Sequence, residues 1–190
     1  MRLMENIVFL AENILDMKKF GFLMLLAFAL VVASCNEKPR KGGTGEEASA
    51  EVEKSEKFVD FEATYNGKTQ HLSDYVGKGK LVVADFWASW CGPCRKEIPN
   101  LINIHEKFGD KVLVLGIATW DEPADTERAI AELNIPYPQI LNAQTAGSDA
   151  YSITGIPEII VFAPDGTILH RGLRGQELEN AVVEYLQTHP

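Results

Sequence analysis

The sequence predicts an α/β layered sandwich that begins near residue 58. Two short runs, 81–87 and 111–118, are apolar and rich in β-branched residues, which is typical of buried strands. Longer stretches with helical spacing of apolar residues alternate with them, as at 176–186. The 190 residues are 46% hydrophobic and 24% charged, a composition that suits one globular domain with some additional sequence.

A β-hairpin is expected to open the domain, with strands at 58–65 and 69–72. The turn between them contains Asn66-Gly67, a pair that is favoured where both central residues need a positive φ. A short helical turn is expected directly afterwards, at 73–75. The buried strand at 81–87 then follows.

A long helix is expected to begin at Cys91 or Gly92 and to end near Phe108. Apolar side chains recur along this stretch at the spacing that places them on one side of a helix, namely Ile98, Leu101, Ile102, Ile104 and Phe108. Pro99 lies inside the stretch. Because proline lacks a backbone donor and its ring crowds the preceding turn, we expect a kink there.

The second half of the domain continues the alternation of strands and helices. We expect a strand at 111–118, a helix at 122–133 and a short strand at 137–141. A hairpin should follow, with strands at 158–162 and 167–171, and then a terminal helix at 176–186. The first of these strands is apolar on both faces, as parallel strands are. The hairpin turn contains Pro164-Asp165-Gly166, and the terminal helix has an inward apolar face, formed by Leu178, Val182, Val183 and Leu186.

Two thiols lie one helical turn apart, directly after the strand at 81–87. Cys91 stands where the helix begins, and unpaired backbone N–H groups and the helix dipole favour a thiolate at that position. Cys94 lies three residues further on and could close a disulfide with it. Reversible thiol–disulfide exchange is therefore the predicted chemistry.

Two other interpretations of the cysteine pair remain open. A zinc site would need further ligands, but the third cysteine, Cys35, is far upstream and no histidine pair lies nearby, so no metal is expected. A purely structural disulfide is less favoured, because linking residues three apart removes little entropy from the unfolded chain.

The N-terminal third predicts export and anchoring. Residues 17–34 combine a basic start with an apolar run of roughly a dozen residues, too short for the ~20 that span a bilayer, and therefore resemble a signal peptide. The run ends at Cys35, in a sequence that resembles the lipobox of bacterial lipoproteins. This resemblance implies that Cys35 is lipidated. The alternative is a plain signal peptide or a short uncleaved anchor. Residues 1–16 carry acids that are unusual before a signal, so Met17 is expected to be the true start.

The segment from 35 to 54 lacks aromatic residues and is rich in Lys, Gly, Glu and Ser, which predicts a flexible tether to a domain at 55–190. A net charge of -9 argues against nucleic acid as a partner.

The domain resembles the thioredoxin-fold proteins, and within them the membrane-anchored thiol–disulfide oxidoreductases of the TlpA/ResA type. The resemblance rests on motifs at family spacing: Asp85-Phe86-Trp87, Trp90-Cys91-Gly92-Pro93-Cys94, Glu97, Pro99 and Ile156-Pro157. It implies a three-layer sandwich with a central mixed β-sheet and an N-terminal β-hairpin extension. It also implies a monomer that uses no cofactor.

The resemblance assigns roles to four catalytic residues. Cys91 would be the exposed nucleophile, and Cys94 the resolving thiol that breaks the mixed disulfide. Asp85 matches the buried acid of thioredoxins, whose burial raises its pKa and lets it take a proton from Cys94; the alternative is a salt-bridged structural acid. Glu97 matches an active-site glutamate of the ResA-like group, with a solvated helix face as the alternative.

Substrate contacts are expected from Trp90, from Gly92-Pro93 between the cysteines, and from Ile156-Pro157. Pro157 matches a cis-proline next to which the family pairs backbone with a bound peptide. Glu158 departs from the threonine that often follows this proline, which puts the substrate preference in doubt. Trp90 is expected to wall the thiol site.

The sequence thus predicts an extracytoplasmic thiol–disulfide oxidoreductase whose dithiol reduces disulfides of other proteins. The resemblance implies apocytochrome c as a substrate and a membrane reductant of the CcdA or DsbD type as the electron donor. A peroxiredoxin-like thiol peroxidase is one alternative, although the proline that precedes a peroxidatic cysteine is missing from Trp87-Ala88-Ser89-Trp90. A non-enzymatic lipoprotein that binds peptides along Ile156-Pro157 is another. The direction of electron flow stays open.

Overall fold

A computed structural model describes residues 56–190 of the chain. The expectations for residues 1–16, 17–34 and 35–54, including lipidation of Cys35, lie outside these residues. Among residues 56–190, no helix has the length and apolar character needed to span a bilayer.

A five-stranded mixed sheet forms the centre of the domain, in the order β5-β4-β3-β6-β7. The central strand β3 (Leu81–Trp87) pairs in parallel with β4 (Val112–Ala118) and antiparallel with β6 (Glu158–Phe162). The edges are β5 (Gln139–Ile140), parallel to β4, and β7 (Ile168–Arg171), antiparallel to β6. The predicted mixed α/β fold is confirmed.

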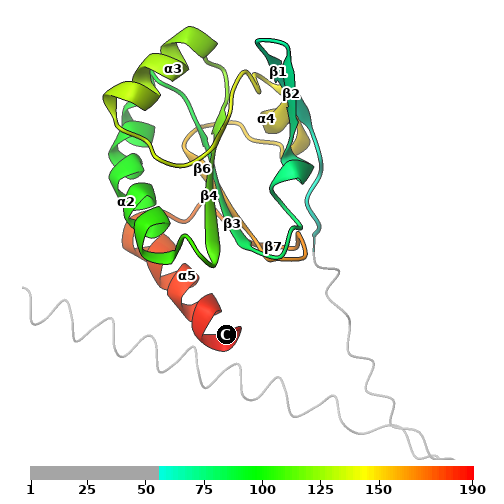
Figure 1. The fold of residues 1–190 in the computed structure, drawn as a ribbon, viewed down its shortest axis with the longest axis vertical. Helices are drawn as coiled ribbons and strands as arrows, with labels where there is room; N and C mark the ends of the chain where they lie inside the picture. Colours follow the sequence, from blue (N-terminus) through cyan, green and yellow to red (C-terminus); the bar gives the residue numbers. More distant parts are fainter. Residues whose placement is uncertain (1–55) are drawn as a thin grey trace, which may run out of the picture. The chain divides into compact units, whose positions relative to one another are not determined.

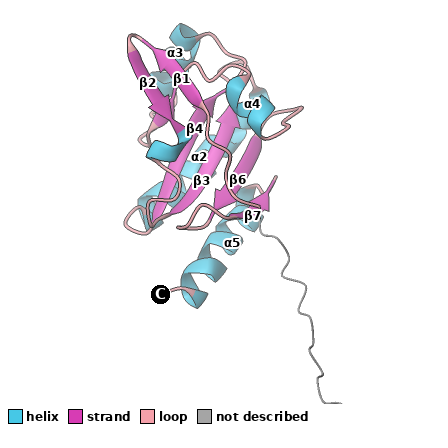
Figure 2. Cartoon of the chain, turned by 90° about the vertical axis from the view of Figure 1, so that its right-hand side faces the viewer, coloured by secondary structure: helices cyan, strands magenta, loops and turns pink. Residues whose placement is uncertain are grey.

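Helices cover one face of the sheet: α2 (Gly92–Phe108), α3 (Pro123–Glu132) and α5 (Gly175–Thr188) (Figure 1). The hairpin of β1 (Glu62–Tyr65) and β2 (Lys68–His71), the 3-10 turn η2 (Leu72–Asp74) and the short helix α4 (Ala146–Ala150) lie on the other. Figure 2 views the sheet from the hairpin side, with α2 behind β3 and β4.

Two apolar cores result, one on each side of the sheet. All seven residues of β3 are buried, and side chains alternate between the faces of a strand. Leu81, Val83 and Trp87 therefore pack with α2 and α5, whereas Val82 and Phe86 pack with the hairpin side. The same alternation directs the side chain of Asp85 toward α2.

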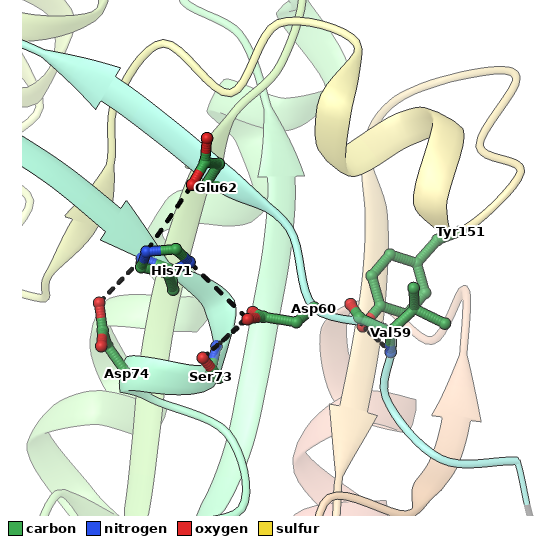
Figure 3. A network of polar contacts seen from close by, with 7 residues as sticks. All are labelled: Val59, Asp60, Glu62, His71, Ser73, Asp74 and Tyr151. Atoms are coloured by element: carbon green, nitrogen blue, oxygen red, sulfur yellow. Dashed lines mark hydrogen bonds and ion pairs between the residues drawn. The ribbon is translucent and has the colours of Figure 1, made fainter.

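The N-terminal hairpin is confirmed, with Asn66 and Gly67 at φ 50° and 74° in its turn, but its first strand is shorter than predicted. Residues 58–61 hydrogen-bond to other elements instead of pairing with β2. The hydroxyl of Tyr151 in the loop after α4 donates to the carbonyl of Val59 (2.9 Å) and accepts from its N–H (3.0 Å) (Figure 3). Asp60 accepts from the N–H and the hydroxyl of Ser73, each at 2.8 Å.

Other element boundaries differ in ways that have local causes. In the strand predicted at 137–141, only Gln139 and Ile140 are paired with residues of β4, and the carbonyl of Pro138 before them accepts the N–H of Gly116. Helix α4 was missed. The terminal helix extends to Thr188. Of its predicted inward residues, Leu178 and Val182 are buried and Leu186 is partly buried and packs against the core, whereas Val183 is partly buried and does not join the core cluster. Helix α2 continues through Pro99; the expected kink stays a prediction.

Candidate active site

The two cysteines lie at the junction between β3 and α2. Cys91 is the N-cap of the helix, with an extended backbone, and its sulfur accepts the N–H of Cys94 at 3.2 Å. The pair is joined by a disulfide, with Cα atoms 5.3 Å apart. Pro93 stands in the first turn, where its missing N–H costs no hydrogen bond. The structure thus shows the oxidised form of the predicted couple.

Cys91 is less accessible than predicted. Only 4% of its surface is exposed, and Cys94 is fully buried, because the bonded Sγ of Cys91 is turned toward Cys94 in the apolar core. The expectation of an exposed nucleophile is therefore wrong for the disulfide form. Gly92 and Pro93 between the two cysteines are exposed, so a partner approaching the disulfide meets this dipeptide first.

Asp85 is a fully buried carboxyl on the α2 side of β3. Within residues 56–190 neither of its oxygens has a hydrogen-bond partner. Burial, reinforced by the negative charge of Glu97 and opposed by Arg174, raises its pKa to about 8. The alternative of a salt-bridged structural acid does not hold, since no ion pair to Asp85 forms in this part of the chain. A carboxyl with such a pKa can exchange a proton near neutral pH.

Glu97 lies one turn beyond Cys94 on α2 and is held in place. Its Oε1 accepts the N–H of Gly175 at the start of α5 and the side-chain amide of Asn100, each at 2.8 Å. Because the side chain is partly buried and its charge acts on Asp85, Glu97 does not belong to a freely solvated helix face. The structure brings the two predicted acids into electrostatic contact.

The loop before β6 reaches the same end of the sheet as the disulfide. The peptide bond between Ile156 and Pro157 is cis, as the resemblance implies. Glu158, the first residue of β6, pairs with Phe86 near the end of β3, and Ile156 packs against the core cluster that contains both cysteines. Ile156-Pro157 therefore lies at the same end of the sheet as the redox pair, and its role in peptide binding stays a prediction.

Arg174 was not predicted as a site residue. Its guanidinium donates to the carbonyl of Pro157 at 2.6 Å, and its charge acts on Asp85. The residue after it, Gly175, holds Glu97. No local sequence pattern marks this arginine as a site residue, because its contacts join segments that are far apart in the chain.

Trp90 stands at the rim of the site, with 62% of its surface exposed. Its indole N–H donates to the carbonyl of Trp120, which follows β4, at 3.0 Å. The neighbouring Asp121 fixes the two loops together, because its carboxylate accepts from the N–H (2.7 Å) and hydroxyl (2.9 Å) of Ser89. The indole of Trp90, the residue directly before Cys91, is thus held against the loop after β4, and its role as a wall of the thiol site stays a prediction.

No metal centre is evident in the part of the chain that the structure describes. Within 56–190, His, Cys, Asp and Glu side chains form no group of three or more that could hold a metal ion.

Comparison with known proteins agrees with this geometry. The thiol-disulfide oxidoreductase ResA of Bacillus subtilis is 28% identical over 143 residues, which cover 75% of this chain and 77% of ResA. The thioredoxin domain of a thiol-disulfide oxidoreductase from Bacteroides vulgatus superposes with a TM-score of 0.62 at 31% identity, over 69% of this chain and 96% of that domain. An exposed lipoprotein thioredoxin of Streptococcus pneumoniae gives a TM-score of 0.55 at 26% identity, over 66% of this chain and 99% of the other.

The AhpC/TSA family description matches residues 55–171, which include both cysteines, both acids and Pro157. These residues occupy the same fold as the thiol–disulfide oxidoreductases above. The chain therefore belongs to the AhpC/TSA family, as a thioredoxin-fold thiol–disulfide oxidoreductase of the ResA-like kind.

Proposed function

We propose that this protein reduces disulfides of other proteins outside the cytoplasm. The observation that carries the proposal is the Cys91–Cys94 pair at the start of α2, with an unpaired, buried Asp85 on the strand that leads into it. A structural bridge needs no ionisable group in the core behind it. A disulfide couple that is reduced and reoxidised needs a nearby group that can accept a proton from a thiol.

The reaction transfers two electrons from the dithiol to the substrate. The thiolate of Cys91 attacks one sulfur of the substrate disulfide, forms a mixed disulfide and releases the other substrate sulfur as a thiolate. Cys94, once deprotonated, attacks the sulfur of Cys91, so that the Cys91–Cys94 disulfide forms and the second substrate sulfur leaves. The substrate gains two electrons and two protons, and the protein loses the same number.

Asp85 serves the second step. A pKa of about 8 leaves a fraction of this carboxyl ionised near neutral pH, ready to accept the proton of Cys94. Glu97 adjusts that pKa by its charge, and Arg174 opposes it. The helix N-terminus stabilises the thiolate of Cys91 in the first step, because its backbone N–H groups and dipole favour a negative charge.

The substrate polypeptide is proposed to lie across Gly92-Pro93 and to pair its backbone with Ile156, next to Pro157. Trp90 would contribute an apolar wall. Glu158, where many relatives are expected to have threonine, forms an ion pair with Arg171 at 3.4 Å and so brings charge close to this backbone.

The protein is further proposed to be a monomeric lipoprotein. Residues 17–34 would be its signal peptide, Cys35 its lipidated N-terminus, and 35–54 a tether to the domain at 55–190, with residues 1–16 preceding the true start. The lipobox-like sequence supports this, as does the likeness to a lipoprotein thioredoxin. A membrane thiol reductant of the CcdA or DsbD type would return the couple to the dithiol, and apocytochrome c is a candidate substrate through the ResA resemblance.

Insulin disulfide reduction and peroxide consumption by the same samples test the activity. We expect the protein to reduce insulin, and both Cys91→Ser and Cys94→Ser to abolish turnover. Peroxide consumption that survives Cys94→Ser would instead support a peroxiredoxin-like thiol peroxidase. Full activity in cells after Cys91→Ser would support a peptide-binding lipoprotein. The reduction potential of the couple, measured against glutathione, tests the direction, since a reductant needs a potential below that of its substrates.

A further inference from the structure

An open hollow of about 410 Å³ lies beside the exposed indole of Trp90, the residue directly before Cys91. The lining residues are two tryptophans, three acidic residues and one glutamine: Trp90, Trp120, Asp121, Glu122, Asp125 and Gln144. No lysine, arginine or histidine belongs to this lining. Two of the three acids, Glu122 and Asp125, are at least partly exposed, whereas Asp121 is buried.

The walls of the hollow are fixed by the protein's own hydrogen bonds. Trp90 donates to the carbonyl of Trp120 at 3.0 Å, and Trp120 has a left-handed backbone, with φ 55°. The side-chain amide of Gln144 donates to the carbonyl of Asp121 at 2.7 Å. A rigid, partly aromatic wall loses little entropy when a ligand binds.

The three carboxylates of the lining differ in the hydrogen bonds and ion pairs that they form within the protein. Asp121 accepts from Ser89 and also from the hydroxyl of Thr126 at 2.7 Å, and Asp125 pairs with Arg128 at 2.8 Å. Glu122 is exposed, and among residues 56–190 its side chain has neither a hydrogen bond nor an ion pair. Glu122 is thus the acid that can pair with an incoming positive charge.

We propose that this hollow is a specificity subsite that receives a lysine or arginine side chain located beside the disulfide of the protein substrate. The inference rests on the proposed function, because it concerns the same cysteine pair. A cation over an indole face gains electrostatic attraction, and a carboxylate beside it adds to that attraction. Its place next to Cys91 puts the subsite within reach of a residue that neighbours the attacked cysteine.

The test uses two synthetic peptides, each closed by one disulfide and identical except for lysine or norleucine beside one cysteine. The second-order rate constant for oxidation of the reduced protein is measured with each peptide. Each value is divided by the rate constant for the same peptide with dithiothreitol, which removes the effect of lysine on the intrinsic reactivity of the disulfide. The ratio of the two quotients is the preference for lysine.

We expect the preference for the lysine peptide to be about fivefold at low ionic strength. This is the combined effect expected from one exposed charge contact and one cation–π contact. Glu122→Gln should reduce it to about twofold, and high salt should reduce it in the wild type. The control Glu106→Gln removes an equal charge from an exposed position on α2 and should retain the preference.

Equal normalised rates of the wild type with the two peptides would overturn the subsite. An equal loss of the lysine preference in Glu122→Gln and Glu106→Gln would also overturn it, because it would indicate a general attraction by the negatively charged protein. Failure to reduce either peptide would overturn the proposed function itself. The two failures are therefore distinguishable.

Discussion

The buried carboxyl of Asp85 gives the stability of the oxidised protein a pH dependence that can be calculated. Its pKa is about 8 in the folded chain and 3.8 for an ordinary aspartate. Between these values the unfolded chain ionises Asp85 while the folded chain keeps it protonated, so the folded state binds more protons. The free energy of unfolding therefore falls as the pH rises through this window, by about 1.4 kcal/mol per pH unit from this group.

Asp85→Asn removes the titration and keeps a side chain of the same shape. Relative to the wild type, the variant should gain on the order of 4 kcal/mol between pH 4 and pH 7, in addition to an offset that does not change with pH. The offset contains any cost of burying the amide, which does not depend on pH, so only the slope is diagnostic.

Urea unfolding of both oxidised proteins at about five pH values between 4 and 8 measures this difference. Glu106→Gln, an exposed change on α2, controls for the loss of one negative charge. A difference between Asp85→Asn and the wild type that stays flat across the window would refute the placement of Asp85 as a protonated acid in the core.

The other predictions concern the groups around the site. Glu97→Gln removes a negative charge that raises the pKa of Asp85, so the pH midpoint of the step that closes the Cys91–Cys94 disulfide should move down. Arg174→Gln removes the opposing positive charge, so the same midpoint should move up. Stopped-flow rates of this step, measured over a range of pH, test both shifts. Shifts in the same direction would contradict the electrostatic account. Gln139→Ala removes the acceptor of the buried indole N–H of Trp87, a 2.9 Å bond, and should cost about 1–3 kcal/mol in urea unfolding. An unchanged unfolding midpoint would show that this bond contributes nothing.

The sequence predicted best those features that are set locally. Strand β3 was predicted to the residue, because seven consecutive residues suited to a buried strand stand between a lysine-glycine turn and the cysteine motif. Strand β6 was equally clear. Helix α4 was missed since Ala-Gly-Ser-Asp-Ala has no apolar periodicity, and β5 was overestimated because Tyr137 is buried without being paired in the sheet.

The site was only partly predictable for the same physical reason. Spacing within one segment placed Cys91 and Cys94, and alternation along β3 agreed with a buried Asp85. The contact between Glu97 and Gly175 joins residues 78 positions apart, and that between Arg174 and Pro157 joins two loops. Such contacts depend on how the sheet and α5 pack, which no local pattern encodes.

The claim on which the account depends is that Cys91 attacks and Cys94 resolves. Incubating the Cys94→Ser protein with a disulfide-bonded protein substrate, and mapping the linked peptides by mass spectrometry, tests it most directly. The account predicts a stable mixed disulfide through Cys91, and none after Cys91→Ser. Linkage through Cys35, the third cysteine of the chain, or absence of any mixed disulfide, would contradict it.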